Sequence, residues 1–255
     1  MRVATFNILH GRTVGDGVDP ARLATCVREL DPDILALQEV DLDQDRSGRA
    51  DLTAVAAEAM GAVAHRFVAA ISGTPGATWI AATGEEQPGT AAYGIALLSR
   101  YPVTSWQVLR LPRIPFRFPM YLPGPNKVMI VDEEPRAAVI AQLDTPLGPI
   151  SVANTHLSFV PGWNRRQLRR LAADLGGLPG PHILTGDLNL TPDAVARCTG
   201  LRTLGGAAAT FPAELPTRQL DHVLTDDPGL RASRCETPAA ALSDHRPLVI
   251  DIERD

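Results

Sequence analysis

The chain has 255 residues, of which 45% are hydrophobic and 21% are charged, and its formal net charge is −5. These proportions are typical of a globular protein and exclude a disordered or collagen-like chain. The negative charge argues against a dedicated nucleic-acid binder, because neutralising phosphates supplies most of the affinity in that class. A chain with a negative net charge can still carry a local basic face, so nucleic-acid binding is not excluded. Three cysteines, an odd number without metal-site spacing, argue against a disulfide framework.

The N-terminal residues lack the apolar stretch of a signal peptide, and no run of about 18 apolar residues occurs. No linker-like change of composition interrupts the chain. We therefore expect one domain over residues 1–255, located in the cytoplasm, with no transmembrane segment and no obligate protein partner.

The predicted elements alternate short apolar strands with helices. Residues 3–8 form a first strand, Asp19 and Pro20 begin a helix that continues to Leu30, and residues 34–37 have the apolar run of a buried central strand. Residues 51–60 predict a second helix, residues 165–175 a third with four arginines, and Thr191 and Pro192 open a short fourth one. Further strands are predicted at 63–69, 78–82, 93–98, 136–143, 150–155, 182–185, 220–225 and 247–252. This mixture of hairpins and crossovers indicates an α/β layered fold.

Residues 109–134 stand apart from this alternation. The segment is rich in proline and mixes apolar side chains with Arg110, Arg113, Arg117 and Lys127. Long irregular insertions in compact domains are usually functional or disordered. We interpret the segment as an irregular insertion, with a functional loop and a surface loop as equal alternatives.

Amide, carboxylate and imidazole groups gather at the ends of several predicted strands, most of them just after a strand and the last ones at or just before the start of the final two strands. A carboxylate directly after a buried strand is costly unless it is solvated, paired or bound to metal. Hard oxygen donors without paired cysteines suit Mg²⁺, Mn²⁺ or Ca²⁺ better than Zn²⁺, and a histidine can bind phosphate or move protons. Each residue alone also has an ordinary explanation as a turn, cap or surface acid. The set is Asn7, Glu39, Asn154, His156, Asp187, Asn189, Asp221, His222, Asp244 and His245.

Seven motifs in one order make the pattern specific. They are TFNILHG at 5–11, DILALQEVD at 33–41, YGIALLSRYPV at 93–103, NTHLS at 154–158, LTGDLNLTP at 184–192, LDHVL at 220–224 and LSDHRPLVIDI at 242–252. With these motifs the sequence resembles the endonuclease/exonuclease/phosphatase superfamily, which includes deoxyribonuclease I, abasic-site endonucleases, neutral sphingomyelinases and inositol polyphosphate 5-phosphatases. The resemblance implies a four-layer αββα sandwich of two mixed β-sheets and a phosphoester hydrolase that uses Mg²⁺ or Mn²⁺.

The resemblance also implies catalytic roles for five residues. Asp187 resembles the acid that orients or deprotonates the attacking water, and Asn189 helps to position that water. His245 resembles the histidine that stabilises the pentacovalent phosphate, and Asp221 the acid that orients it. His156 resembles a phosphate-contacting histidine.

Glu39 resembles the main metal ligand, supported by Asn7 and Asp244. The chain has Leu9 where some relatives carry an acid two residues after the asparagine, so the resemblance does not support a second-metal arrangement that uses that acid. The expected substrate contacts are Asn154, Arg136 and Arg165.

The substrate stays open among three alternatives. A hydrolase of small soluble phosphoesters suits the acidic balance, and the preferred interpretation is a general phosphodiesterase whose leaving group is not specified. A nuclease would use the arginines of 165–170 and 110–117, and a phospholipid phosphodiesterase would use Trp106, Phe116, Phe118, Met120 and Tyr121. A non-catalytic binding module is the alternative from another class, but the retained acids and histidines argue against it.

Overall fold

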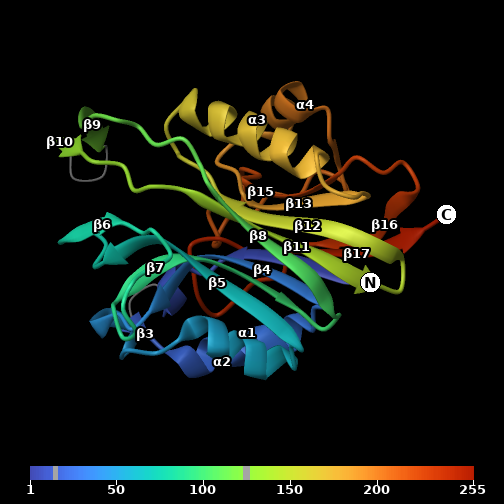
Figure 1. Ribbon diagram of the computed structural model, residues 1–255, viewed down its shortest axis with the longest axis horizontal. Coiled ribbons are helices and arrows are strands. Elements are labelled where there is room, and N and C mark those ends of the chain that lie inside the picture. The colour runs from blue at the N-terminus through green and yellow to red at the C-terminus, as the bar shows by residue number, and fades with distance from the viewer. Residues whose placement is uncertain (14–16, 123–126) are drawn as a thin grey trace.

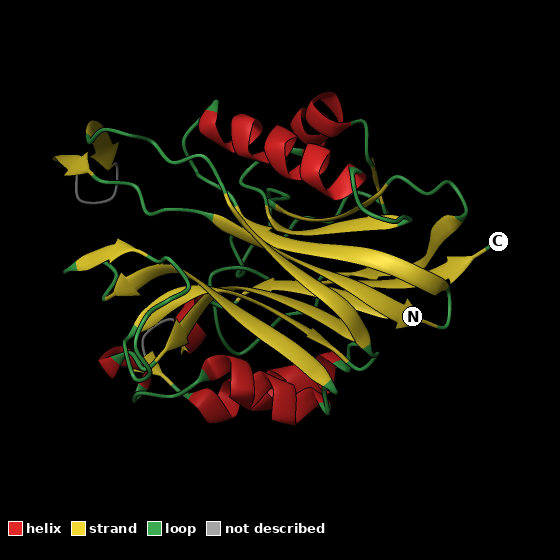
Figure 2. Cartoon of the chain, in the orientation of Figure 1, coloured by secondary structure: helices red, strands yellow, loops and turns green. Residues whose placement is uncertain are grey.

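Two β-sheets lie face to face and helices cover their outer faces in the computed structural model, which describes residues 1–13, 17–122 and 127–255 (Figure 1, Figure 2). The seven-stranded sheet has the order β16 (Leu230–Glu236), β17 (Leu248–Arg254), β1 (Arg2–Asn7), β4 (Ile34–Leu42), β7 (Ala92–Ser99), β5 (Ala64–Gly73) and β6 (Trp79–Ala81). The six-stranded sheet has the order β14 (Arg202–Thr203), β15 (Asp221–Thr225), β13 (His182–Asp187), β12 (Gly148–His156), β11 (Ala137–Thr145) and β8 (Val103–Arg110). Each sheet contains one parallel pair, β1 with β4 and β12 with β13, among antiparallel neighbours.

Helices form the two outer layers. The helices α1 (Pro20–Leu30) and α2 (Leu52–Met60) cover the seven-stranded sheet, and α3 (Trp163–Gly176) and α4 (Pro192–Thr199) cover the six-stranded sheet (Figure 1). The predicted start of α1 is confirmed, because the Asp19 side chain accepts a hydrogen bond from the backbone N–H of Ala21. In the described part of the chain, no helix is long and apolar enough to span a membrane. Short 3₁₀ turns occur as η1 (Leu9–Gly11) and η2 (Asp45–Ser47).

Three apolar clusters hold the layers together. One lies between the sheets, and its fully buried members include Val3, Val139 and Val152. The second joins α1 and α2 to the seven-stranded sheet, and the third joins α3 and α4 to the six-stranded sheet. The predicted four-layer αββα sandwich of two mixed sheets is therefore confirmed.

Several strands depart from the sequence prediction. The edge strands β8 and β16 were not predicted, because both have exposed and charged side chains where a buried strand would be apolar. The segment 109–134 is not wholly irregular, since β9 (Phe118–Leu122) and β10 (Lys127–Val131) pair as an antiparallel ribbon apart from the large sheets. Prolines in this stretch conceal the strand pattern from sequence reasoning. A second ribbon joins β2 (Arg12–Thr13) to β3 (Gly17–Val18).

Candidate active site

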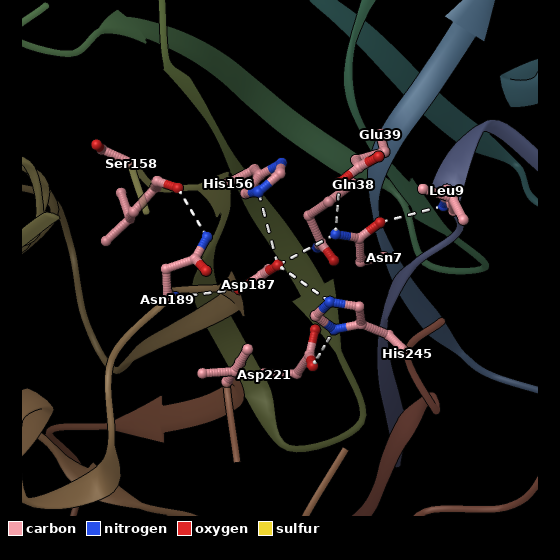
Figure 3. Close-up of polar contacts among 12 residues, drawn as sticks. Asn7, Leu9, Gln38, Glu39, His156, Ser158, Asp187, Asn189, Asp221 and His245 are labelled. Atoms are coloured by element: carbon pink, nitrogen blue, oxygen red, sulfur yellow. Dashed lines mark hydrogen bonds and ion pairs between the residues drawn. The ribbon is translucent and has the colours of Figure 1, made fainter. Parts of the chain in front are cut away.

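The polar strand ends meet in one cleft of about 330 Å³ at the edge of the sandwich. Because side chains alternate along a strand, every second residue of β1, β12 and β13 points between the sheets. These rows begin in the inter-sheet cluster with Val3, Val152 and Ile183. Four residues further on, at the edge, the same rows end on Asn7, His156 and Asp187 (Figure 3).

Glu39 reaches the cleft through an irregularity in β4. The pairing of β4 with β7 shifts between Gln38 and Val40, and Glu39 has a φ of 57°. Such a bulge turns a side chain away from the regular alternation and is common beside active sites. Glu39 is half-buried, and its Oε1 accepts a hydrogen bond from Asn7 Nδ2 at 3.0 Å.

Asn7 links the two sheets at the floor of the cleft. Its Nδ2 also donates to Asp187 Oδ2 at 3.1 Å, and its Oδ1 accepts the Leu9 backbone N–H at 3.1 Å. The asparagine therefore holds the carboxylates of Glu39 and Asp187 on either side of one amide group.

Asp187 lies at the centre of the cluster and is 2% exposed. Its Oδ2 is 3.6 Å from His156 Nε2 and 3.8 Å from His245 Nε2, while its Oδ1 accepts the Asn189 backbone N–H. Burial and the nearby charge of Asp221 raise the pKa of Asp187 to about 7, against the opposing effects of His245 and the donors. A carboxyl group with a pKa near neutrality suits proton transfer.

Asp221 and His245 form a buried pair behind Asp187. His245 Nδ1 and Asp221 Oδ2 are 2.9 Å apart, and Thr210 Oγ1 donates to the same oxygen. Burial lowers the pKa of His245, but the hydrogen bond to Asp221 and the surrounding carboxylates raise it to about 9. His245 is therefore cationic at neutral pH, and its Nε2 is left to face the cleft (Figure 3).

His156 has the opposite electrostatic environment. Burial, together with the positive charges of Arg136 and His245, holds the pKa of His156 well below its usual range. The cleft therefore presents one neutral and one cationic imidazole, both next to Asp187.

The loop after β13 is shaped by Gly186 and Asn189. Gly186 has a φ of 135°, and a Cβ there would collide with the Thr155 carbonyl oxygen. Asn189 has a φ of 50°, and its side-chain amide donates to the Leu157 carbonyl oxygen at 3.0 Å. The GDLN motif thus turns sharply enough to keep Asp187 and Asn189 both on the cleft.

The cleft contains two groups of residues that could hold a divalent cation, and the carboxylates of Glu39 and Asp244 suit one better than the compact cluster around Asp187. Ligand atoms of Asp187, Asp221 and His245 lie within 4.8 Å of one another. Asp221 Oδ2 is already engaged by two donors, so this cluster is a hydrogen-bonded relay. Glu39 and Asp244 are only partly buried and line the cleft, and hard carboxylate oxygens of this kind suit Mg²⁺ or Mn²⁺.

Two predicted substrate contacts lie outside the cleft. Arg165 is exposed on α3 and does not line it. Asn154 is fully buried between the sheets, where its Nδ2 donates to the carbonyl oxygens of Leu37 and Ala96 and its Oδ1 accepts from Gln38. Asn154 lies on the same face of β12 as His156 but two residues earlier, away from the cleft and between the sheets. Its hydrogen bonds therefore join the two sheets.

Replacing Asn154 with alanine is expected to destabilise the fold by about 2–4 kcal/mol, because buried backbone acceptors would lose their donor. Urea unfolding of Asn154→Ala beside Arg165→Ala measures this. Equal midpoints for the two variants would contradict the assignment.

Five cleft residues were missed by sequence reasoning: Tyr93, Asp132, Glu133, Glu134 and Phe159. Tyr93 begins a predicted strand, where its aromatic ring is typical of a core position. The three acids fall in the segment interpreted as irregular. The only available signal was their position in the chain just before Arg136, a residue that also lines the cleft.

Comparisons with known proteins agree with the fold. A sequence model described as the Endonuclease/Exonuclease/phosphatase family matches residues 4–245. An endonuclease/exonuclease/phosphatase from Beutenbergia cavernae is 24% identical, with a TM-score of 0.74 over 100% of this chain and 71% of that one. The human Nocturnin catalytic domain, solved with a bound sulfate anion, is 19% identical, with a TM-score of 0.64 over 100% of this chain and 93% of that one.

A mannosyl-6-phosphatase from Bacteroides thetaiotaomicron is 17% identical, with a TM-score of 0.64 over 99% of both chains. A comparison with curated proteins finds no significant match. At these identities the structural likenesses show a shared fold and leave the substrate undetermined.

Proposed function

This chain belongs to the endonuclease/exonuclease/phosphatase family, and from that premise we propose that it is a divalent-metal-dependent phosphoester hydrolase, specifically a phosphodiesterase. The observation that carries the proposal is Asp187, a buried acid with a pKa near neutrality. It lies between two imidazoles, of which His156 is neutral and His245 is cationic. This arrangement can take a proton from water and stabilise negative charge at the same place.

Glu39, with Asn7 and Asp244, would hold Mg²⁺ or Mn²⁺, which when bound offsets charge on a phosphoryl oxygen. Asp187 orients the attacking water and accepts its proton as the water oxygen bonds to phosphorus and the ester P–O bond breaks.

The histidines stabilise the phosphoryl oxygens during that step. His245 donates from Nε2, because its Nδ1 is held by Asp221. His156 is the second contact, and Arg136 adds a guanidinium at the cleft wall. Preorganised donors of this kind are typically worth about 3 kcal/mol each in the transition state.

Hydrolysis of bis(p-nitrophenyl) phosphate tests the proposal. We expect turnover with Mg²⁺ or Mn²⁺, its loss in EDTA and its return when metal is restored, with slower hydrolysis of p-nitrophenyl phosphate. Turnover that persists after chelation would contradict metal dependence. Faster monoester hydrolysis would replace the phosphodiesterase assignment by a phosphatase.

A phospholipid phosphodiesterase is a second candidate, favoured by exposed apolar side chains near the β9–β10 ribbon. Phe116, Val128 and Ile130 are 60%, 63% and 65% exposed. Trp106, predicted to belong to this surface, instead packs against the inter-sheet core from β8. The side chains of Met120 and Tyr121 lie outside the described part of the structure.

A further inference from the structure

Tyr93 presents a hydroxyl group without a partner to the cleft. Its side chain comes from β7, the strand beside β4, and it lines the cleft although it is only 8% exposed. Within the described ranges the hydroxyl has no hydrogen-bond partner, and it is not one of the polar atoms enclosed without solvent access. A largely buried phenol usually has a hydrogen-bond partner, so an unpaired one at a cleft indicates an acceptor on a ligand.

The ring of Tyr93 is supported by an ion pair on its own sheet. Asp41 and Tyr93 pair across β4 and β7, so their side chains lie on the same face of the sheet. Asp41 is fully buried and accepts two hydrogen bonds from Arg46, at 2.7 and 2.8 Å. These bonds fix the guanidinium group, whose Cζ lies 5.5 Å from the centroid of the Tyr93 ring in a cation–π contact. A ring held in this way needs little further ordering when a ligand binds.

The environment keeps the Tyr93 hydroxyl protonated. Burial and the nearby charges of Glu39 and Glu134 raise the pKa of Tyr93 well above its usual value, although two nearby arginines oppose them. The hydroxyl is therefore a neutral hydrogen-bond donor at neutral pH. A phosphoryl group beside Glu39 would bring the charged oxygen that this donor lacks, and hydrogen bonds to charged oxygens are the strong ones.

We propose that the Tyr93 hydroxyl is a substrate contact that donates a hydrogen bond to a phosphoryl oxygen, and that Arg46 is a positioning residue that acts through the Tyr93 ring. This inference rests on the proposed function, which places the phosphoryl group between Glu39 and Asp187. His156 and Asp187 approach that place from the six-stranded sheet, so Tyr93 supplies a donor from the seven-stranded one.

NMR spectra of the full chain labelled with ¹³C at the ζ-carbon of tyrosine test the contact without turnover. The chain has three tyrosines, so the spectrum of Tyr93→Phe assigns the Tyr93 signal. Titration with inorganic phosphate, once with Mg²⁺ and once in EDTA, should shift the Tyr93 signal in at least one buffer. The signal of Tyr101, which does not line the cleft, should stay in place. A Tyr93 signal that phosphate moves in neither buffer would overturn the contact.

Kinetics test the same donor during the reaction. Tyr93→Phe keeps the ring and should lower kcat/KM for bis(p-nitrophenyl) phosphate by about tenfold to a hundredfold, as expected for a hydrogen bond to a charged group. Tyr101→Phe is the matched control and should keep the wild-type value. Arg46→Lys preserves a cation beside Asp41 and should lower kcat/KM severalfold alone, but no further in the Tyr93→Phe background, because coupled residues are not additive.

Each outcome bears on one part of the inference. An unchanged kcat/KM in Tyr93→Phe would overturn the substrate contact, and additive losses in the double variant would remove Arg46 from the positioning role. A Tyr93 signal that shifts with phosphate in a protein that hydrolyses no diester would count against the proposed function alone.

Discussion

Asp187→Asn is expected to lower kcat for bis(p-nitrophenyl) phosphate by about a thousandfold, the range that general-base catalysis supplies. Asparagine keeps the size of the side chain and can still accept the Asn189 backbone N–H at one oxygen, so the fold should persist. It cannot accept a proton from water. Steady-state kinetics should therefore show the loss mainly in kcat, with KM changed little.

The matched control for this variant is Asp193→Asn, an exposed carboxylate in the first turn of α4. Its kcat should equal that of the wild type. A kcat for Asp187→Asn within tenfold of the wild type would remove Asp187 from the proton-transfer role and shift attention to the remaining cleft acids.

Glu39→Gln is expected to weaken Mn²⁺ binding by about a hundredfold, because it removes the charged hard-oxygen donor that such ions prefer. The glutamine can keep the hydrogen bond from Asn7 Nδ2 to its own Oε1, so neighbouring geometry should be retained. Calorimetric titration with MnCl₂ measures the change, and Glu58→Gln, at an exposed position on α2, serves as the control for loss of one acid. Unchanged Mn²⁺ affinity would show that the ion is held elsewhere, with the Asp187, Asp221 and His245 cluster as the next candidate.

Some of the strand ends that build the cleft were predictable, because their polar groups stand at the end of an apolar run. Asp187 and His156 are examples, since period-two alternation places both on the inner face of their strands. The pairing of Asp221 with His245 at 2.9 Å was not readable from spacing, because two separate segments meet only in the folded sheet pair. Only the resemblance to the family implied that Asp221 orients His245.

The burial of Asn154 could not be predicted from the alternation of side chains along its strand. The residue shares its strand face with His156, but depth between two sheets depends on what the opposite sheet places there. The opposite sheet places Gln38 there, whose Nε2 donates to Asn154 Oδ1, and the carbonyl oxygens of Leu37 and Ala96, which accept from Asn154 Nδ2. The acids Glu133 and Glu134 were missed for a different reason, because they fall in the proline-rich segment 109–134, whose composition predicted no regular structure.

The most direct test of the central claim compares the wild type with Glu39→Gln in hydrolysis of bis(p-nitrophenyl) phosphate at one saturating Mn²⁺ concentration. The proposed site predicts steady release of p-nitrophenol by the wild type and at least a hundredfold slower release by the variant, in line with loss of a metal-ligating carboxylate. Equal rates for the two proteins, with both correctly folded, would contradict it.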